Sequence, residues 1–165
     1  RKAKGRKGQT AAPSVPAKAV DAALEGWLAS PADFRPAMPG TDICAFPARF
    51  AAELEALQAV LRVLGAGIPL ATPRGNSLLP AHGLALSTAL ATDAFPRAET
   101  DLDTALAYLR HEAIALPAAP RGIVLLTYRD VPLGFAKNLG TRANNLYPAE
   151  WRIRTSHTEG ANQAW

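Results

Sequence analysis

Two apolar runs separated by two polar residues place the strongest constraint on what this chain can fold into. The runs are GIVLLTY at 122–128 and VPLGFAK at 131–137, with Arg129-Asp130 between them. Apolar runs of this length joined by two residues are typical of a β-hairpin. The turn lacks the glycine that best tolerates positive φ, and Pro132 has no N–H, which favours a sheet edge or a strand start. The pair predicts a sheet near the C-terminal end of the chain.

Other segments carry helical or extended patterns. We expect a short helix at 21–30, a strand at 42–46, a helix from 47, a helix at 79–91, a helix at 101–110 and strands at 113–116 and 151–155. Thr100 followed by Asp103 resembles a capping box for the helix at 101–110. Residues 58–64, QAVLRVL, fit either a continued helix or a buried strand, and their periodicity does not decide between the two.

Length and composition bound the class of protein. A chain of 165 residues that is 48% apolar has room for one sizeable domain or two small ones, and its mixed patterns predict an α+β fold. It lacks an apolar run of the ~20 residues needed to span a membrane, so we expect no membrane partner. The single Cys44 fits a reducing compartment, and we expect a cytoplasmic monomer. Residue 1 is Arg, so we take the chain as part of a longer protein.

The charges are unevenly distributed along the chain. Residues 1–20 hold six Lys/Arg and no acid, residues 21–120 hold six Lys/Arg against eleven acids, and residues 121–154 hold six against two. Basic clusters of this kind favour polyanions, nucleic acid above all. The composition of 1–20 is also that of a flexible linker between domains.

Residue patterns for independent catalysis are missing from the sequence. His82, His111 and His157 have no Cys or His partner at metal-ligand spacing, so we expect neither a metal site nor a catalytic residue. The chain has no glycine-rich phosphate loop and no nucleophile elbow, so we expect no cofactor bound to it. Cys44 lies inside an apolar run, where a buried thiol is usually inert.

Residues 134–154, GFAKNLGTRANNLYPAEWRIR, combine cations, amides and aromatic rings. Cations neutralise phosphates, asparagines read base edges or cap turns, and rings stack on unpaired bases. For Trp151 we favour burial in the core over stacking, and for Tyr147 the two roles are evenly balanced. The predicted RNA-binding residues here are Lys137, Asn138, Arg142, Asn144, Asn145, Tyr147, Arg152 and Arg154.

The same region resembles a known family. The segment YLRHEAIAL…RGIVLLTYRDVPLGFAKNLGTRANNLYPAEWRIR is similar to the PUA-like RNA-binding end of the Sun/RsmF family of rRNA cytosine-5 methyltransferases. Upstream, VLRVLGAGIPLATPRGNSLLPAHGLAL resembles the segment that precedes that module, and the whole resemblance covers roughly residues 40–154. The residues that carry it are Gly67, Leu70, Pro80, His82, Leu84-Ala85, Tyr108-Leu109, Glu112, Gly122, Leu125-Leu126-Thr127, Pro132-Leu133-Gly134, Lys137, Gly140, Arg142, Asn145, Tyr147-Pro148 and Trp151-Arg152.

The resemblance implies a parent enzyme with its catalytic domain N-terminal to this chain. That domain would bind S-adenosylmethionine and use a cysteine thiolate, and Cys44 matches neither family cysteine. The resemblance also implies a small β-barrel in the C-terminal part and a strand at 58–64, with the preceding helix ending near Ala56. The segment 72–82, TPRGNSLLPAH, departs from the family because it offers only Arg74 where lysines are common. Arg74 is therefore the one RNA contact predicted there.

Together these observations predict a basic linker at 1–20, an α+β subdomain at 21–92, a PUA-like RNA-binding domain at 93–155 and a tail at 156–165. The expected function is to dock rRNA for the methyltransferase domain of the same polypeptide. The alternative is a PUA-like module that contacts protein and not RNA.

Overall fold

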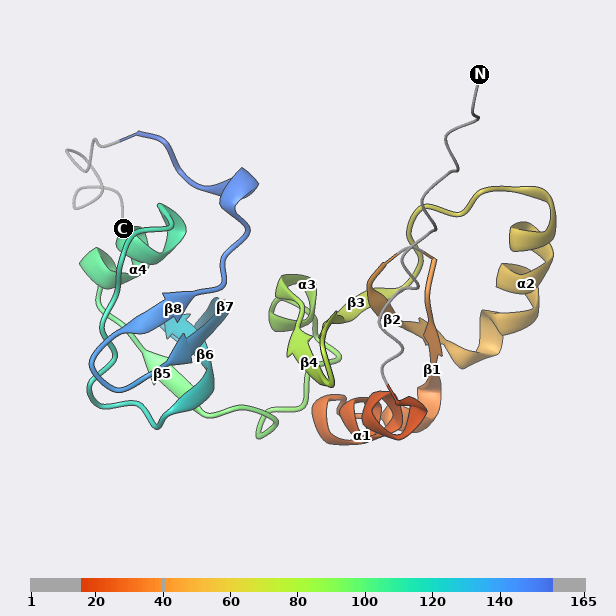
Figure 1. The fold of residues 1–165 in the computed structure, drawn as a ribbon, viewed down its shortest axis with the longest axis horizontal. Helices are drawn as coiled ribbons and strands as arrows, with labels where there is room; N and C mark the ends of the chain where they lie inside the picture. Colours follow the sequence, from red (N-terminus) through yellow and green to blue (C-terminus); the bar gives the residue numbers. More distant parts are fainter. Residues whose placement is uncertain (1–15, 40, 156–165) are drawn as a thin grey trace, which may run out of the picture. The chain divides into compact units, whose positions relative to one another are not determined.

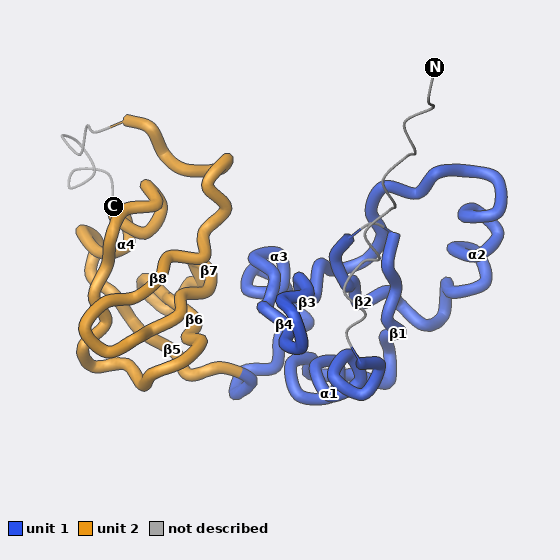
Figure 2. The backbone as a smooth tube through the Cα atoms, in the orientation of Figure 1, with its two compact units in different colours: residues 1–94 blue, residues 95–165 orange. Residues whose placement is uncertain are grey.

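The computed structural model describes residues 16–39 and 41–155 of the chain. The chain divides into two compact units, residues 1–94 and 95–165 (Figure 2). Helices and strands occur in both units (Figure 1), which confirms the α+β fold class.

The first unit is built on an antiparallel sheet in the order β1-β2-β3-β4. Its strands are β1 (Phe34–Ala37), β2 (Ile43–Pro47), β3 (Ile68–Arg74) and β4 (Ser77–Pro80). The apolar run at 42–46 is therefore a strand, as predicted. Ile43, Leu70 and Leu84 are almost fully buried in this unit. The sheet is contacted by α1 (Ala17–Trp27) and α3 (His82–Ala85), and η1 (Pro31–Asp33) joins α1 to β1.

The helix α1 overlaps the segment that was expected to be a linker. It begins at Ala17 after Pro16 and buries Ala23 and Leu24. The linker prediction is therefore wrong for residues 17–20, because alanine-rich sequence after a proline is well suited to a first helical turn. Residues 1–15 lie outside the described residues.

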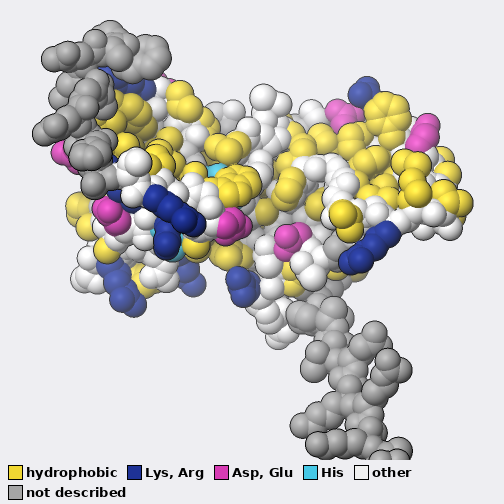
Figure 3. Space-filling model, turned by 90° about the horizontal axis from the view of Figure 1, so that it is seen from above, with side chains coloured by type: hydrophobic (Ala, Val, Ile, Leu, Met, Phe, Trp, Pro, Cys, Tyr) yellow, Lys and Arg dark blue, Asp and Glu magenta, His cyan; other side chains and the backbone are white. Residues whose placement is uncertain are grey.

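The helix α2 (Ala51–Val60), which follows η2 (Ala48–Phe50), runs further than expected. The prediction of a strand at 58–64 is wrong. The N–H of Leu61 still donates to the carbonyl of Leu57 at 2.8 Å, so the helical hydrogen bonding continues to residue 61. Val60 and Leu64 are each 78% exposed, so their apolar character does not reflect burial in a sheet. Apolar side chains gather at this end of the unit, at the right of Figure 3.

The helix expected at 79–91 is reduced to the four residues of α3. Pro80 belongs instead to β4, where it lies opposite Ala71 of β3. The first residues of the apolar run pair with β3 and so belong to the sheet. This long-range pairing outweighs their helical periodicity.

The second unit is built on a mixed sheet in the order β5-β6-β7-β8. Its elements are β5 (Arg97–Glu99), α4 (Leu102–Leu109), β6 (Gly122–Tyr128), β7 (Val131–Asn138), β8 (Ala143–Asn145) and η3 (Ala149–Trp151). β5 runs parallel to β6, and the other pairs are antiparallel. The predicted hairpin is therefore confirmed. Its two turn residues, Arg129 and Asp130, adopt φ values of 49° and 64°, as a type I′ turn requires, without a glycine.

The helix predicted at 101–110 is confirmed as α4, with a different cap. The side chain of Asp101 accepts from the N–H of Thr104 at 2.8 Å, so Asp101 is the N-cap and not Thr100. Thr100 instead donates its hydroxyl to the carbonyl of Thr127 and so ties the helix start to β6.

The core of the second unit lies between α4 and the sheet. Its buried members are Ala98, Tyr108, Ile114, Leu116, Val124, Leu126, Ala136 and Ala143. The strand expected at 113–116 is a single bridge between Ile114 and Ala143, and the closing strand expected at 151–155 is the end of η3 and irregular chain. Of the barrel implied by the resemblance, the described residues show four hydrogen-bonded strands with β5 and β8 at the ends of the order.

Candidate nucleic-acid interface

The predicted cations of the second unit lie on its surface. Lys137, Arg142, Arg152 and Arg154 are all exposed, and Figure 3 shows Lys and Arg side chains over this unit. Lys137 of β7 lies directly opposite Asn144 of β8, which is also exposed. Directly opposite residues in antiparallel strands share a face of the sheet. The structure thus brings Lys137 and Asn144 together at one edge, with Arg142 just before β8.

Arg74 is exposed at the end of β3, in the first unit. It lies beside Gly75, whose φ of 59° is typical of a tight turn. Its hairpin, β3–β4, is separate from the sheet that carries the other predicted RNA-binding residues.

Asn138 has a structural role that the sequence did not reveal. It is only 2% exposed, and its amide nitrogen donates to the carbonyls of Leu116, Ala119 and Pro120 at 2.8–3.2 Å. Its side-chain oxygen accepts from the N–H of Gly140 at 3.0 Å. The nitrogen thus holds the 116–120 loop against β7, and the oxygen fixes the turn at Gly140. These contacts give the side chain a structural role and do not support the predicted contact of Asn138 with RNA.

Asn145 and Tyr147 are half-buried and fix the chain after β8. The amide of Asn145 donates to the carbonyl of Tyr108 at 2.8 Å, and its oxygen accepts from the N–H of Tyr147 at 2.9 Å. The ring of Tyr147 meets that of Tyr108 edge to face, with centroids 5.4 Å apart. For Tyr147 this contact agrees with the core alternative more than with a ring free to stack on a base.

Trp151 does not lie in the core. It is 58% exposed at the end of η3, so the preference for a buried indole is wrong. The short segment has no long apolar run that could pack against the sheet. Its backbone is nevertheless held, because the N–H of Trp151 donates to the carbonyl of Pro148 at 3.0 Å and the hydroxyl of Tyr147 donates to the carbonyl of Trp151 at 3.5 Å.

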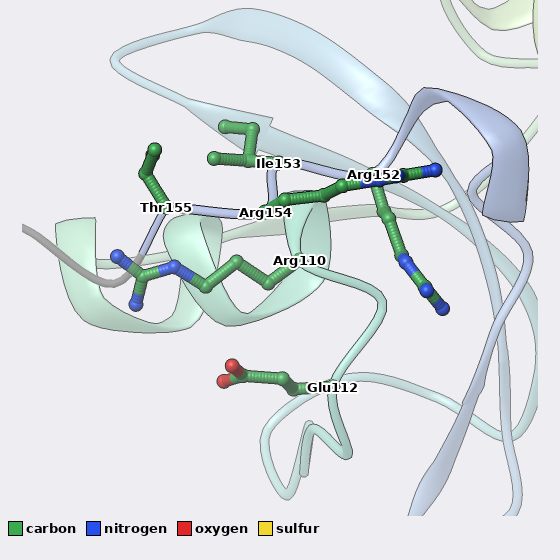
Figure 4. Close-up of a pocket in the computed structure, with 6 residues that line it drawn as sticks. All are labelled: Arg110, Glu112, Arg152, Ile153, Arg154 and Thr155. Carbon is green, nitrogen blue, oxygen red and sulfur yellow. The ribbon is translucent and has the colours of Figure 1, made fainter.

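A pocket of about 400 Å³ lies where the chain after η3 passes over the end of α4 (Figure 4). The N–H of Ile153 donates to the carbonyl of Leu109 at 3.0 Å and anchors that passing segment. The residues that line the pocket are Arg110, Glu112, Arg152, Ile153, Arg154 and Thr155. Arg110 was missed by sequence reasoning, because it stands alone at the end of a helix some forty residues before Arg152 and Arg154. Only the tertiary contact with 152–155 reveals it.

Arg110 has an unsatisfied hydrogen-bond donor. Its Nε is buried and has no hydrogen-bond partner. A buried N–H without an acceptor costs about 1–3 kcal/mol relative to a satisfied one. Among the described residues, no ion pair joins the arginines of the pocket to Glu112. The charged residues of the lining, three arginines and one glutamate, carry net positive charge, which favours anions near this surface.

The remaining titratable groups offer no alternative site. Burial raises the pKa of the Cys44 thiol above its ordinary value, so the thiol stays protonated and is a poor nucleophile. Within residues 16–39 and 41–155, His, Cys, Asp and Glu form no group of three that could hold a metal ion. None of the helices described is both long and apolar enough to cross a membrane.

The comparisons with known proteins agree with this picture of the second unit. Residues 95–153 match the family model described as the methyltransferase RsmF PUA domain. No curated protein matches the chain. The matched residues run from the start of the second unit to the pocket segment, and they support an RNA-binding accessory role. The match confirms that the C-terminal unit resembles the PUA domain of RsmF-type methyltransferases.

Proposed function

We propose that this chain holds rRNA for an S-adenosylmethionine-dependent cytosine-5 methyltransferase whose catalytic domain precedes it in the same polypeptide. The observation that carries the proposal is the match of residues 95–153 to the RsmF PUA domain. Exposed Lys137, Arg142, Arg152 and Arg154 supply the cations that phosphate binding requires.

Tethering gives such a domain its effect on the reaction. A bound RNA segment is held near the neighbouring catalytic domain, so its effective concentration there rises without any new contact in the active site. Positioning the RNA backbone also restricts which cytosine reaches the reacting groups, and orientation contributes to rate as well as to affinity.

The test of RNA binding is the affinity of the chain for a structured rRNA fragment across roughly 50–200 mM salt. Lys137→Ala and Arg142→Ala should each weaken binding and lower the slope of log affinity against log salt by about one unit. Arg62→Ala removes the same charge from an exposed position in the first unit and serves as the matched control. If the parent chain does not bind RNA, or if both variants bind it like the control, the proposal fails.

A protein-interaction module is the second candidate, and one observation favours it. The exposed apolar side chains along η2, α2 and the chain after α2 are Phe50, Leu57, Val60, Leu61 and Leu64. Contiguous exposed apolar surface often marks contacts with other proteins. Binding through such a surface would be insensitive to salt, whereas binding through phosphates weakens steeply as salt rises.

The chain alone should transfer no methyl group. The described residues contain no thiol poised as a thiolate, and the sequence contains no cofactor loop. Incubation with labelled S-adenosylmethionine and rRNA should leave the RNA unlabelled, while an active rRNA methyltransferase labels it in a parallel reaction. Label incorporated by the chain itself would place a catalytic site within these residues.

A further inference from the structure

The turn between β7 and β8 contacts an arginine that the sequence did not single out. The turn spans residues 139–142 and is closed by a hydrogen bond of 2.9 Å from the N–H of Leu139 to the carbonyl of Arg142. A Cβ added at Gly140, whose φ is 98°, would lie 3.0 Å from Nε and 3.1 Å from a terminal nitrogen of Arg121. The guanidinium of Arg121 therefore lies directly beside Gly140, in space that is open because residue 140 has no side chain.

Asn138 fixes the backbone on both sides of this contact. Its amide nitrogen donates to the carbonyl of Pro120, the residue before Arg121, at 3.2 Å, and its oxygen accepts from the N–H of Gly140 at 3.0 Å. Gly122, the residue after Arg121, lies opposite Asn138 in the register of β6 and β7. One buried side chain thus joins the backbone that carries Arg121 to the backbone of the turn. A ligand that binds there meets a preorganised surface, which lowers the cost of binding.

A row of side chains next to the turn lies on the face of the sheet opposite the core. Lys137 of β7 lies opposite Ile123 of β6 and opposite Asn144 of β8, and these three strands run side by side (Figure 1). Directly opposite residues share a face, and successive residues of a strand point to opposite faces. Ala136, the residue before Lys137, belongs to the core between α4 and the sheet. The row of Ile123, Lys137 and Asn144 therefore faces away from α4.

Arg142 is a neighbour of Lys137 at this end of the sheet. It lies two residues before Asn144 and directly before β8, so strand alternation makes it the diagonal neighbour of Lys137 at about 7–8 Å. Arg121 reaches the same turn through its contact with Gly140. Arg121, Lys137 and Arg142 thus form an exposed group of cations around the β7–β8 turn, the turn cluster, to which three segments contribute.

Within the described residues, no carboxylate neutralises the turn cluster. The side chains of its three members make no hydrogen bond or ion pair with residues 16–39 and 41–155. The one acid between positions 113 and 149 is Asp130, which lies in the turn at the opposite end of the hairpin β6–β7. The seven residues of β6 separate the two ends by roughly 20 Å. The turn cluster therefore keeps its full positive charge, which favours a polyanion.

The strands β6, β7 and β8 present no exposed ring near the turn cluster. Phe135, two residues before Lys137 on the same face, is 1% exposed and packs against Phe95 with ring centroids 4.7 Å apart. Surfaces that bind single strands rely on exposed rings, whereas double-helical RNA is held through its phosphates and 2′-hydroxyls. The amide of Asn144 can donate to and accept from such a hydroxyl. This surface therefore fits the backbone of an RNA helix better than an unpaired strand.

We propose that the turn cluster binds the sugar-phosphate backbone of a double-helical RNA segment and that Arg121 is a further phosphate-binding residue. This inference rests on the proposed RNA-binding function and specifies its ligand. It also gives Gly140 a role in binding, since a side chain at residue 140 would displace the guanidinium of Arg121.

The experiment compares binding of the full chain to a labelled RNA duplex of about 16 base pairs and to an oligouridylate of about ten nucleotides. Arg121→Ala should weaken duplex binding about five- to tenfold and lower its salt slope by about one unit. Any binding of the oligouridylate should stay unchanged. Arg129→Ala removes the same charge at the opposite end of the same hairpin and is the matched control, so it should bind both RNAs like the parent chain.

Two further variants separate the charge of Arg121 from its packing. Arg121→Gln keeps most of the stem beside the turn and removes the charge, so it should lose as much duplex affinity as Arg121→Ala. Arg121→Lys keeps the charge and should restore the salt slope of the parent chain. Melting curves are measured for each variant. If Arg121→Ala loses stability, Arg121→Gln carries the test, because the salt slope of a folded variant reports its phosphate contacts.

The outcomes separate this inference from the proposed function. If Lys137→Ala and Arg142→Ala weaken binding of the structured rRNA fragment while both charge-removing variants of Arg121 bind the duplex like the control, the inference is overturned alone. Equal losses on the duplex and on the oligouridylate would overturn the double-helical ligand. If the parent chain binds the rRNA fragment but not the duplex, the inference fails and the proposed function stands. If the parent chain binds no RNA, both fail.

Discussion

Asn138 shows how one side chain can be essential for the fold while looking like a binding residue. Its amide joins β7 to the 116–120 loop through three backbone carbonyls, and its oxygen accepts from Gly140. Gly140 has a φ of 98°, and an added Cβ would lie 3.0 Å from the guanidinium of Arg121. The loop is therefore shaped by a buried hydrogen-bond network around one asparagine.

Replacing Asn138 by Ala should lower the free energy of unfolding by about 2–4 kcal/mol, because buried backbone groups lose their partners. Asn144→Ala, at an exposed position of the neighbouring strand, should change it by less than about 0.5 kcal/mol. Denaturant titrations of both variants provide the measurement. Equal stability of the two would show that the network around Asn138 contributes nothing.

Gly67 is a second residue where backbone conformation matters. Its φ is 76°, and a Cβ built on it would lie 2.4 Å from the carbonyl oxygen of Ala45 in β2. Gly67→Ala should destabilise the first unit by about 1–3 kcal/mol through strain and the close approach. Gly65→Ala is the control, since nothing lies within 4 Å of its added Cβ. Thermal midpoints that shift by the same amount in both would contradict the role of the close approach.

At the scale of elements, the hairpin β6–β7 is secured at its turn by β5. The carboxylate of Glu99 accepts from the hydroxyl of Thr127 and from the N–H of Arg129, both at 2.5 Å. These bonds compensate for a turn whose two residues both need positive φ. Through Glu99, the short parallel strand β5 thus stabilises the hairpin β6–β7, which is the element that the sequence predicts most clearly.

This arrangement predicts a pH dependence. The hydrogen bond from Thr127, with those from Arg129 and Asp130, lowers the pKa of Glu99 from its ordinary value of 4.5. A depressed pKa in the folded state contributes stability above the unfolded pKa, and this stability is lost as pH falls through the folded pKa. In melting curves at acidic pH, the midpoint of Glu99→Gln should therefore fall less steeply than that of the parent chain. If the melting midpoints of Glu99→Gln and of the parent chain fall equally steeply as pH decreases, the Glu99 carboxylate is not linked to folding.

At the scale of the whole molecule, each unit has its own sheet and its own buried residues. The helix α4 and the hairpin β6–β7 both lie within residues 95–155, the second unit. The same range contains the exposed cations Lys137, Arg142, Arg152 and Arg154. Its core is formed entirely by residues of the same unit. A domain of this size is small but within the range that folds alone.

Residues 95–155 expressed alone should therefore unfold in one cooperative transition and bind the structured rRNA fragment with the salt slope of the full chain. Circular dichroism on heating and anisotropy titrations test the two parts. A fragment that folds but does not bind RNA would assign an essential share of the contacts to the first unit, with Arg74 as the first candidate.

The sequence by itself determined the elements whose signals are local. The hairpin at 122–137, the helix near 101–110 and the strand at 42–46 follow from apolar periodicity and turn spacing, and the exposure of Lys137, Arg142, Arg152 and Arg154 follows from their charge. Periodicity is sufficient there because neighbouring residues alone decide which side of the element is apolar.

Only the tertiary structure decided the rest. Pairing with β3 turned part of the apolar run at 79–91 into β4, and residues 58–64 stayed outside any sheet although their composition allowed a strand. The burial of Asn138 depends on contacts with a loop more than fifteen residues away in the sequence. The pocket that Arg110 lines together with Arg152 and Arg154 joins segments some forty residues apart. The exposure of Trp151 likewise follows from the tertiary structure. Local patterns carry no information on such contacts, because the partner that buries a side chain or completes a pocket comes from another part of the chain.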